Sequence, residues 1–569
     1  MCRVEHPNPQ FKRSSYECLN GQWDFGMCQY GADTVLTDKI EVPFCPESRL
    51  SGIGYRGYIT DCVYSREIDI TEEDLQGRLV LHFGAVDYIA TVYVNGKKAI
   101  EHTGGYTAFE VDIAPYAFVG TNKITVAVHD DVRENIPSGK QSKELDSHGC
   151  FYTRSTGIWQ TVWLERTPVN YIKSVKFYPQ PDRAAVKAEV FIEGCGEVSI
   201  NVSFDGRKVG SACGYVEYRH TFEIELSELH LWDIGKGYLY DAEIVFGSDR
   251  VESYFGMRTV SFEGVKFMLN GKSVFQRLVL DQGYYEDGIY TAKDEKQFSA
   301  DIALSNALGF NGARLHQKIF EQRFLYECDK AGYMVWCEFP SWGMKCDSVK
   351  SLGMFVSQWS EVVEQYFNHP SIVTWCPLNE VWEDLDNKKL VRDVRFVEAA
   401  YNVTKLLDPT RPCVDASGGY HGRFTDIFDF HNYHTGDETV KYIQDIETTN
   451  TLTMDTLYAP DFAQELIPYD GGLPINASEY GGMIYTKQSD DGWGYQSVAS
   501  EESFISEYER MTEAYLDCKK ISGFCYTQLY DVEQEQNGLY SYLREKKFSE
   551  NGMKRIAACN ARIAAIEKI

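Results

Sequence analysis

The stretch "SIVTWCPLNE", residues 371–380, decides how the second half of the chain folds. Ile372 to Cys376 are apolar or β-branched residues suited to a buried strand, and they lead to Asn379 and Glu380, two residue types that strands usually avoid. Desolvating an amide and a carboxylate at the tip of a buried strand is costly unless both are hydrogen-bonded or put to use. A second carboxylate facing Glu380 is therefore expected elsewhere in the chain.

Strand patterns of the same kind alternate with amphipathic helix patterns throughout the part of the chain that follows Arg258. Eight strand-helix units in about 310 residues are typical of a (β/α)8 barrel, in which the chemistry lies at the C-terminal ends of the strands. The expected strands are "SVFQRLVLDQG", "GFNGARLHQ", "GYMVWCEFP", "SIVTWCPLNE", "RPCVDASG", "IFDFHNYH", "LPINASEYGG" and "ISGFCYTQLY".

Residues 13–257 have a different pattern, with short β-branched and aromatic segments separated by turns. "TVYVNGKKAI" alternates around Asn95-Gly96, and "VSFDGRKVG" alternates around Asp205-Gly206, so both predict β-hairpins. We expect three domains: a β-sandwich over residues 1–166, an immunoglobulin-like β-sandwich over 167–257 and a barrel over 258–569.

The amino-acid composition limits the classes of molecule that the protein is expected to bind. With 56 Lys and Arg against 84 Asp and Glu, the net charge is −28, which argues against binding to nucleic acid or to an anionic membrane and favours a small neutral substrate. There is no apolar run typical of a signal peptide or of a membrane span, and the 16 cysteines form no CxxC pairs. A cytoplasmic protein with reduced cysteines is expected, and a homo-oligomer is compatible with the sequence.

The matching carboxylate is Glu479 in "NASEYGG", at the end of the seventh expected strand. Across a barrel mouth it would face Glu380, and two facing carboxylates are what glycoside hydrolysis needs, one as an acid and one as an ionised nucleophile. A single glutamate at such a position is more often a buried, paired carboxylate. Two of them at strand ends, one preceded by Asn379, favour the catalytic interpretation.

Other polar residues at strand ends are candidates for binding the substrate or supporting the two glutamates. An arginine or a tyrosine hydroxyl beside a carboxylate lowers its pKa. His431 and His434 would point to opposite faces of a strand, so neither a metal nor a cofactor is expected. Five tryptophans are expected near the mouth, although core packing is slightly favoured for any one of them: Trp336, Trp342, Trp375, Trp382 and Trp493. The polar candidates are Asp281, Gln282, Arg314, His316, Glu338, Asn379, His431, Tyr433 and Gln528.

Several motifs give the chain a resemblance to glycoside hydrolase family 2, which includes β-galactosidases, β-glucuronidases and β-mannosidases. They are "GARLHQ", "DKAGYMVWCEFP", "HPSIVTWCPLNE", "SEYGG" and "GFCYTQLYDVEQEQNGLY", with "VYVNG", "TGIWQTVWLE" and "FGMRTV" upstream. The resemblance covers nearly the whole chain and implies a sugar-binding jelly roll, an immunoglobulin-like sandwich and a catalytic barrel. It implies that Glu380 is the acid/base, that Glu479 is the nucleophile and that Asn379 contacts the sugar 2-hydroxyl. Arg314 and Tyr433 match residues that hold the nucleophile.

Two departures from the family pattern concern the sugar. "LDQGYYEDG" stands where β-galactosidases and β-glucuronidases carry a His-containing motif, so Asp281 and Gln282 replace familiar subsite residues. The Asn-x-Lys element that grips a glucuronide carboxylate should precede "GLY" after strand 8, but "EQEQNG" stands there without a lysine. A retaining exo-glycosidase acting on a β-galactoside is therefore the leading hypothesis. A β-galactofuranoside or α-L-arabinofuranoside comes second, a β-glucuronide third, and a catalytically silent carbohydrate-binding protein is the alternative from another class.

Overall fold

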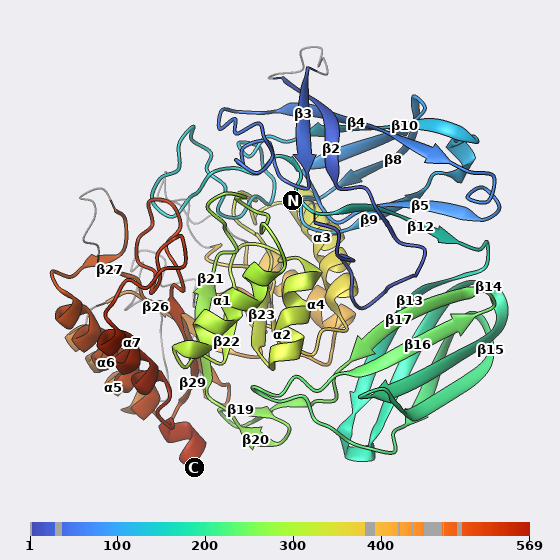
Figure 1. Ribbon diagram of the computed structural model, residues 1–569. Helices are drawn as coiled ribbons and strands as arrows, with labels where there is room; N and C mark the ends of the chain where they lie inside the picture. The colour runs from blue at the N-terminus through green and yellow to red at the C-terminus, as the bar shows by residue number, and fades with distance from the viewer. Residues whose placement is uncertain are drawn as a thin grey trace.

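The fold is seen in a computed structural model that describes residues 3–28, 37–381, 393–418, 421–434, 436–448, 469, 471–485 and 492–569. It has the architecture expected from the sequence, with two β-sandwiches followed by a (β/α)8 barrel (Figure 1). The elements change from antiparallel strands to alternating strands and helices after β17 (Asp249–Phe255). The domain boundaries at residues 166 and 257 stay predictions.

The first sandwich packs a four-stranded sheet on a six-stranded sheet around one apolar core. The predicted hairpin at Asn95-Gly96 is confirmed, since both residues have positive φ (51° and 78°), as a two-residue turn requires. The first sheet is β1 (Glu17–Cys18), β12 (Val162–Thr167), β5 (Arg78–Phe83) and β9 (Phe109–Asp112). The second sheet is β3 (Asp38–Val42), β2 (Gly21–Cys28), β4 (Asp61–Ile70), β10 (Gly120–His129), β7 (Ile89–Val94) and β8 (Lys97–Thr103).

The second sandwich is built on one long hairpin. Its strands β14 (Ala185–Phe204) and β15 (Arg207–Glu225) meet at the predicted Asp205-Gly206 turn, where φ is 48° and 73°. A register shift after Phe191 interrupts β14, so its first half pairs with β13 (Tyr171–Gln180) and its second half pairs with β16 (Tyr240–Phe246). The two halves enclose a separate apolar core, and β17 pairs with β16 at the sheet edge.

The barrel consists of parallel strands surrounded by helices. Its strands lie in the order β24 (Ile372–Cys376), β23 (Met334–Glu338), β22 (Gly312–Leu315), β21 (Gln276–Asp281), β29 (Ile521–Thr527), β26 (Ile475–Gly481) and β25 (Phe428–Asn432). The helices are α1 (Lys296–Ala307), α2 (Gln322–Ala331), α3 (Val349–Tyr366), α4 (Val394–Leu407), α5 (Gly436–Thr448), α6 (Glu501–Asp517) and α7 (Glu550–Asn560).

One of the eight expected strand-helix units departs from the regular pattern. The segment "RPCVDASG" forms two isolated parallel bridges, Trp375 with Cys413 and Asn379 with Ser417, instead of a strand. The described residues between Ser417 and β25 contain no helix, because only about ten residues separate the two, too few for a helix with its connections. The prediction of a regular strand at residues 411–418 is therefore wrong, although the segment still occupies the fifth position of the barrel.

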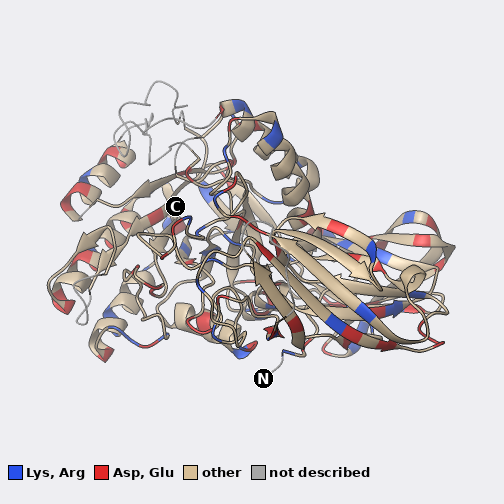
Figure 2. Cartoon of the chain, turned by 90° about the horizontal axis from the view of Figure 1, so that it is seen from above, with Lys and Arg blue, Asp and Glu red and all other residues tan. Residues whose placement is uncertain are grey.

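Loops of the first sandwich reach over the barrel (Figure 1). The N–H groups of Ser138 and Gly139 donate to the carbonyl of Trp342, which follows β23, and Gln534 Nε2, which follows β29, donates to the carbonyl of Gly149. We call residues 138–154 the rim segment, because it borders the mouth of the barrel. No helix in the described part of the chain is both long and apolar enough to cross a membrane. Figure 2 shows acidic and basic residues interspersed along the chain.

Candidate active site

The side chain of Glu479 points into the barrel mouth because its strand is irregular at this position. The pairing of β25 with β26 skips Ser478, so that Glu479 lies opposite His431. An extra residue in one strand re-aims the side chains that follow it. Glu479 is 3% exposed, and its two oxygens accept hydrogen bonds from Arg314 Nη1, at 2.7 Å, and from the hydroxyl of Tyr433.

The partners of Glu479 keep it ionised. Burial alone would raise its pKa, but His431 and Arg314, together with the hydrogen bond from Tyr433, lower the pKa of Glu479 to about 2. The ring of Tyr433 stacks on Tyr495 with its plane inclined by 5°, which fixes the direction of its hydroxyl. The expected link from Arg314 and Tyr433 to Glu479 is therefore present in the geometry.

Glu380 lies beyond the end of its strand. β24 ends at Cys376, and Glu380 has a φ of 44°, in the left-handed region that residues other than glycine rarely adopt. Its N–H donates to the carbonyl of Ser417 at 2.9 Å, so the fifth barrel segment holds this backbone in place. Strained backbone of this kind persists where surrounding structure enforces it, often at functional sites.

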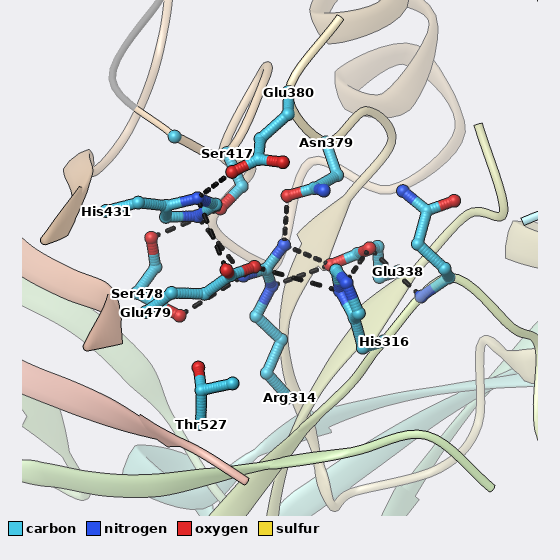
Figure 3. Close-up of polar contacts among 12 residues, drawn as sticks. Arg314, His316, Glu338, Asn379, Glu380, Ser417, His431, Ser478, Glu479 and Thr527 are labelled. Carbon is cyan, nitrogen blue, oxygen red and sulfur yellow. Dashed lines mark hydrogen bonds and ion pairs between the residues drawn. The ribbon is translucent and has the colours of Figure 1, made fainter. Parts of the chain in front are cut away.

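His431 lies between the two glutamates (Figure 3). Its Nδ1 is 2.5 Å from Glu380 Oε1 and 3.5 Å from Glu479 Oε2. Ser417 donates its hydroxyl proton to Asp429 at 2.6 Å, so Ser417 Oγ accepts a hydrogen bond from His431 Nε2 at 3.1 Å. Burial opposes the charged ring, but Glu479 and Glu380 outweigh it and raise the pKa of His431 above its ordinary value. His431 therefore donates a hydrogen bond to Glu380 and stabilises the charge of Glu479.

Arg314 joins the remaining central groups. It is fully buried, and besides Glu479 it donates to Glu338 Oε2 at 2.6 Å and to Asn379 Oδ1 at 2.5 Å. Burial raises the pKa of Glu338 against the opposing charge of Arg314, and burial lowers the pKa of His316 well below its ordinary value, so His316 is neutral. The amide nitrogen of Asn379 is buried and has no partner within the described residues, which leaves it available as a donor to a ligand.

The two glutamates are close enough to act on one atom. A carboxylate oxygen of Glu380, one of Glu479 and a ring nitrogen of His431 all lie within 4.8 Å of one another. The same three atoms could ligate a metal ion, but an ion bound there would occupy both carboxylates. His434 does not join them, because it lies beyond the end of β25, partly exposed beside Glu438.

The other predicted polar residues lie further from the two glutamates. Asp281 accepts hydrogen bonds from the N–H of Gly283 and the hydroxyl of Tyr530, and burial raises the pKa of Asp281 to about 6. It contacts neither glutamate in the described structure. The side-chain oxygens of Gln282 and Gln528 are buried without partners among the described residues, so both stay candidates for binding a sugar hydroxyl.

The tryptophans divide between the core and the mouth. Trp336 and Trp375 are fully buried core residues, with ring N–H groups that donate to Gln276 and Asp408, so the core packing that was slightly favoured for each tryptophan applies to these two. Trp342 donates to the carbonyl of Asn379 at 3.0 Å. Trp493 contacts Tyr495 edge-on at 5.1 Å between ring centroids. Trp382 lies outside the described residues.

Two charged residues that were not among the candidate site residues also belong to the mouth. Lys140, on the rim segment, is 5% exposed, and its ammonium lies 4.1 Å from the centre of the Trp342 ring. Glu535, on the loop after β29, is 2% exposed and accepts a hydrogen bond from the hydroxyl of Tyr152, also on the rim segment. Only the docking of the first sandwich on the barrel brings Lys140 to the site, and no local pattern in the sequence marks it. Glu535 lies in the segment "EQEQNG" of the barrel itself.

Comparison with known proteins places this geometry in a family. Residues 49–168 match the domain described as "Glycosyl hydrolases family 2, sugar binding domain", and residues 260–497 match "Glycosyl hydrolases family 2, TIM barrel domain". Together the two matches cover more than half of the chain. The chain belongs to glycoside hydrolase family 2.

Relatives of this family 2 chain carry different names. A β-galactosidase from Thermoanaerobacterium thermosulfurigenes is 27% identical over 460 residues, which are 75% of this chain and 58% of the relative. A β-glucuronidase from Rattus norvegicus is 26% identical over 395 residues, which are 63% of this chain and 59% of the relative. The chain thus spans less than two thirds of the length of these two relatives.

A family 2 crystal structure has the same fold over nearly its whole length. The β-galacturonidase from Eisenbergiella tayi, bound to glycerol, matches with a TM-score of 0.74 at 20% identity, covering 98% of each chain. At this identity the likeness shows the fold. The sugars in the three names differ in the group carried by C5, a hydroxymethyl or a carboxylate, and in the configuration at C4. The residues of this chain must therefore be used to infer its sugar.

Proposed function

We propose that this chain is a retaining exo-glycosidase that removes a terminal neutral sugar, with a β-galactoside as the leading substrate. The observation that carries the proposal is the pair Glu380 and Glu479 at the barrel mouth, where one carboxylate oxygen of Glu380 lies within 4.8 Å of one of Glu479. In retaining enzymes the two carboxyl groups are about 5–5.5 Å apart, whereas inverting enzymes leave about 6.5–9.5 Å for an attacking water. The short separation supports double displacement.

Glu479 would act as the nucleophile. Its low pKa leaves it ionised at neutral pH, and its buried position gives it few competing water contacts. It would attack the anomeric carbon, form a covalent glycosyl-enzyme and release the leaving-group oxygen. The hydroxyl of Tyr433 and Arg314 would then stabilise the carboxylate as it leaves again in the second step.

Glu380 would act as the acid and then as the base. It is the more exposed of the two, with 19% of its side chain accessible, so it can reach a leaving group and later a water molecule. Its hydrogen bond with His431 would stabilise the carboxylate that Glu380 becomes once its proton has gone to the leaving group, until it takes a proton from the attacking water. The buried Nδ2 of Asn379 would donate to the sugar 2-hydroxyl, a contact that strengthens in such transition states.

The choice of sugar depends on the loop after β29. A β-galactosidase among the relatives supports the proposed substrate, whereas the β-glucuronidase supports an acidic one. The loop carries the buried Glu535 and no lysine between residues 533 and 538, and a uronate bound beside this carboxylate would be poorly compensated by that loop alone. This favours the neutral sugar.

A panel of nitrophenyl glycosides tests the proposal, with galactopyranosides, galactofuranosides, arabinofuranosides and glucuronides at equal concentration. We expect the β-galactoside to be hydrolysed with the best kcat/KM and proton NMR to detect the β-anomer of the free sugar first. Appearance of the α-anomer first would contradict retention, and a glucuronide as the best substrate would contradict the neutral sugar. No hydrolysis of any member would favour a carbohydrate-binding protein without catalysis.

A further inference from the structure

Lys140 and Glu535 reach the barrel mouth from different parts of the chain, and neither has a role in the reaction proposed above. Lys140 belongs to the rim segment of the first sandwich, whereas Glu535 follows the last barrel strand. Both are at least nine-tenths buried. Burying a charge is costly unless a partner or a function compensates for it, so these two side chains require an explanation.

The ammonium of Lys140 is held at the acid/base side of the site. It lies over the ring of Trp342, and the ring N–H of Trp342 donates to the carbonyl of Asn379, the neighbour of Glu380. Gly139 positions it, because a Cβ added at this residue would lie 2.2 Å from the carbonyl oxygen of Gln317. Among the described residues, no carboxylate oxygen lies within 4.0 Å of the Lys140 ammonium, the distance that defines an ion pair.

The carboxylate of Glu535 is oriented by hydrogen bonds from both sides. One oxygen accepts from the hydroxyl of Tyr152 and the other from Asn537 Nδ2 at 2.9 Å. Asn537 Oδ1 in turn accepts from Gln528 Nε2 at 2.8 Å, which leaves the buried oxygen of Gln528 without a partner among the described residues. Glu535 and Gln528 thus form a row of acceptors, which suits sugar hydroxyl groups.

The two charges act on each other without touching. Burial raises the pKa of Glu535, and Lys140 opposes this increase more than any other group does. Burial would lower the pKa of Lys140, but Cys150, Glu535, Glu479 and Glu380 raise it above its ordinary value, so the ammonium stays charged. The two side chains form no ion pair in the described structure, so each influences the other only through the field of its charge.

We propose that Glu535 and Lys140 are specificity-determining residues that select a neutral terminal sugar. This inference rests on the proposed glycosidase function and assigns its preference to two residues. The fixed carboxylate of Glu535 accepts hydrogen bonds from hydroxyl groups of the sugar and repels the carboxylate of a uronic acid. The ammonium of Lys140 compensates the charge of Glu535 while the site is empty. If Glu535 lost its charge, the same ammonium would be free to bind the carboxylate of a uronate.

The test is a specificity switch in the variants Glu535→Gln, Lys140→Met and the double variant. The measured quantity is the ratio of kcat/KM for a nitrophenyl β-glucuronide or β-galacturonide to that for the nitrophenyl β-galactoside. We expect a ratio of about 0.1 or less for the unchanged protein, corresponding to a preference of about 1.4 kcal/mol. Glu535→Gln should raise the ratio at least tenfold, because the repelling charge is gone and Lys140 remains. The double variant should lose most of this increase, since the remaining cation is gone too.

Glu533→Gln is the matched control. Glu533 lies on the same loop and binds the same rim segment, through the N–H and hydroxyl of Thr153, so it shares the structural role of Glu535. Its variant should leave the ratio unchanged. Thermal unfolding of each variant shows whether it is folded, and Glu535→Asp, which keeps the charge, should keep the ratio low.

Two outcomes would overturn the inference while leaving the glycosidase proposal in place. One is a uronide as the best substrate of the unchanged protein, and the other is a folded, active Glu535→Gln variant with an unchanged ratio. An equal increase in the ratio for Glu535→Gln and the double variant would remove Lys140 from the proposal. Absence of hydrolysis of every glycoside by the unchanged protein would instead refute the proposed function itself.

Discussion

Replacement of Tyr433 by phenylalanine should slow the second half of the reaction. The hydroxyl of Tyr433 donates to Glu479, and its ring is held by stacking on Tyr495, so the substitution removes one hydrogen bond with little change in packing. A hydrogen bond to a charged group contributes about 1.5–3 kcal/mol. Because Glu479 regains its charge when the glycosyl-enzyme breaks down, this loss should reduce the rate of that step by about 10- to 150-fold.

The same change should move the acid side of the pH profile. One pKa unit corresponds to about 1.4 kcal/mol, so the pKa of Glu479 should rise by about one to two units. It starts at about 2 in the unchanged protein. Glu479 must be ionised to attack, so activity falls as the pH drops through its pKa, and a higher pKa moves this fall to higher pH. The acid limb of kcat/KM should therefore lie at higher pH in the variant.

Stopped-flow kinetics with a dinitrophenyl glycoside measures both effects. A burst of dinitrophenol followed by slow turnover is expected for Tyr433→Phe, because the glycosyl-enzyme accumulates. Tyr495→Phe is the matched control, since Tyr495 stacks on the same ring and no hydrogen bond joins it to Glu479 in the described structure. A turnover of Tyr433→Phe within twofold of the unchanged protein, with the same acid limb, would refute this assignment of Tyr433.

Three further variants test the rest of the site. Glu380→Ala should form the glycosyl-enzyme from a substrate with a good leaving group but hydrolyse it slowly, and azide should restore turnover and give a glycosyl azide of the substrate's configuration in NMR spectra. Glu479→Ala with azide should give the inverted glycosyl azide, and exchange of the two products would require the two roles to be swapped. Arg314→Met should lower the free energy of unfolding by about 3–5 kcal/mol in a denaturant titration, because Glu338 and Glu479 lose their buried cation. A loss below about 1 kcal/mol would contradict the role given to Arg314.

The barrel and the two glutamates could be predicted because each is encoded locally. Short segments contain the signals that were used: the buried strand patterns, the Gly and Pro residues that end the helices, and the two hairpin turns at Asn95 and Asp205. The exceptions have physical reasons. The fifth barrel strand at residues 411–418 was expected from its apolar pattern, but its backbone pairs only at Cys413 and Ser417. Ser417 instead holds the Glu380 backbone and His431, so the demands of the site interrupt the regular strand.

The details of the site could be predicted only in part. Arg314, His431 and Tyr433 were candidates because they follow strands of one barrel, yet the position of His431 between the two carboxylates depends on the bulge at Ser478, which no residue pattern marks. Strand position alone does not distinguish a side chain in the core from one at the mouth, so core packing was only slightly favoured for Trp336 and Trp375, which lie in the core. Lys140 comes from a separate sandwich, so only the packing of two domains reveals it.

Covalent trapping tests the central claim, that Glu479 is the nucleophile of a retaining glycosidase. A 2-deoxy-2-fluoro β-galactoside with a dinitrophenyl leaving group should inactivate the protein. The fluorine slows both formation and breakdown of the glycosyl-enzyme, but the good leaving group keeps formation fast, so the glycosyl-enzyme accumulates. Peptide mass spectrometry should then find one fluorosugar on the peptide that contains Glu479, and none on the peptide that contains Glu380. A label on Glu380, or release of dinitrophenol with an inverted sugar and no labelled peptide, would contradict the account.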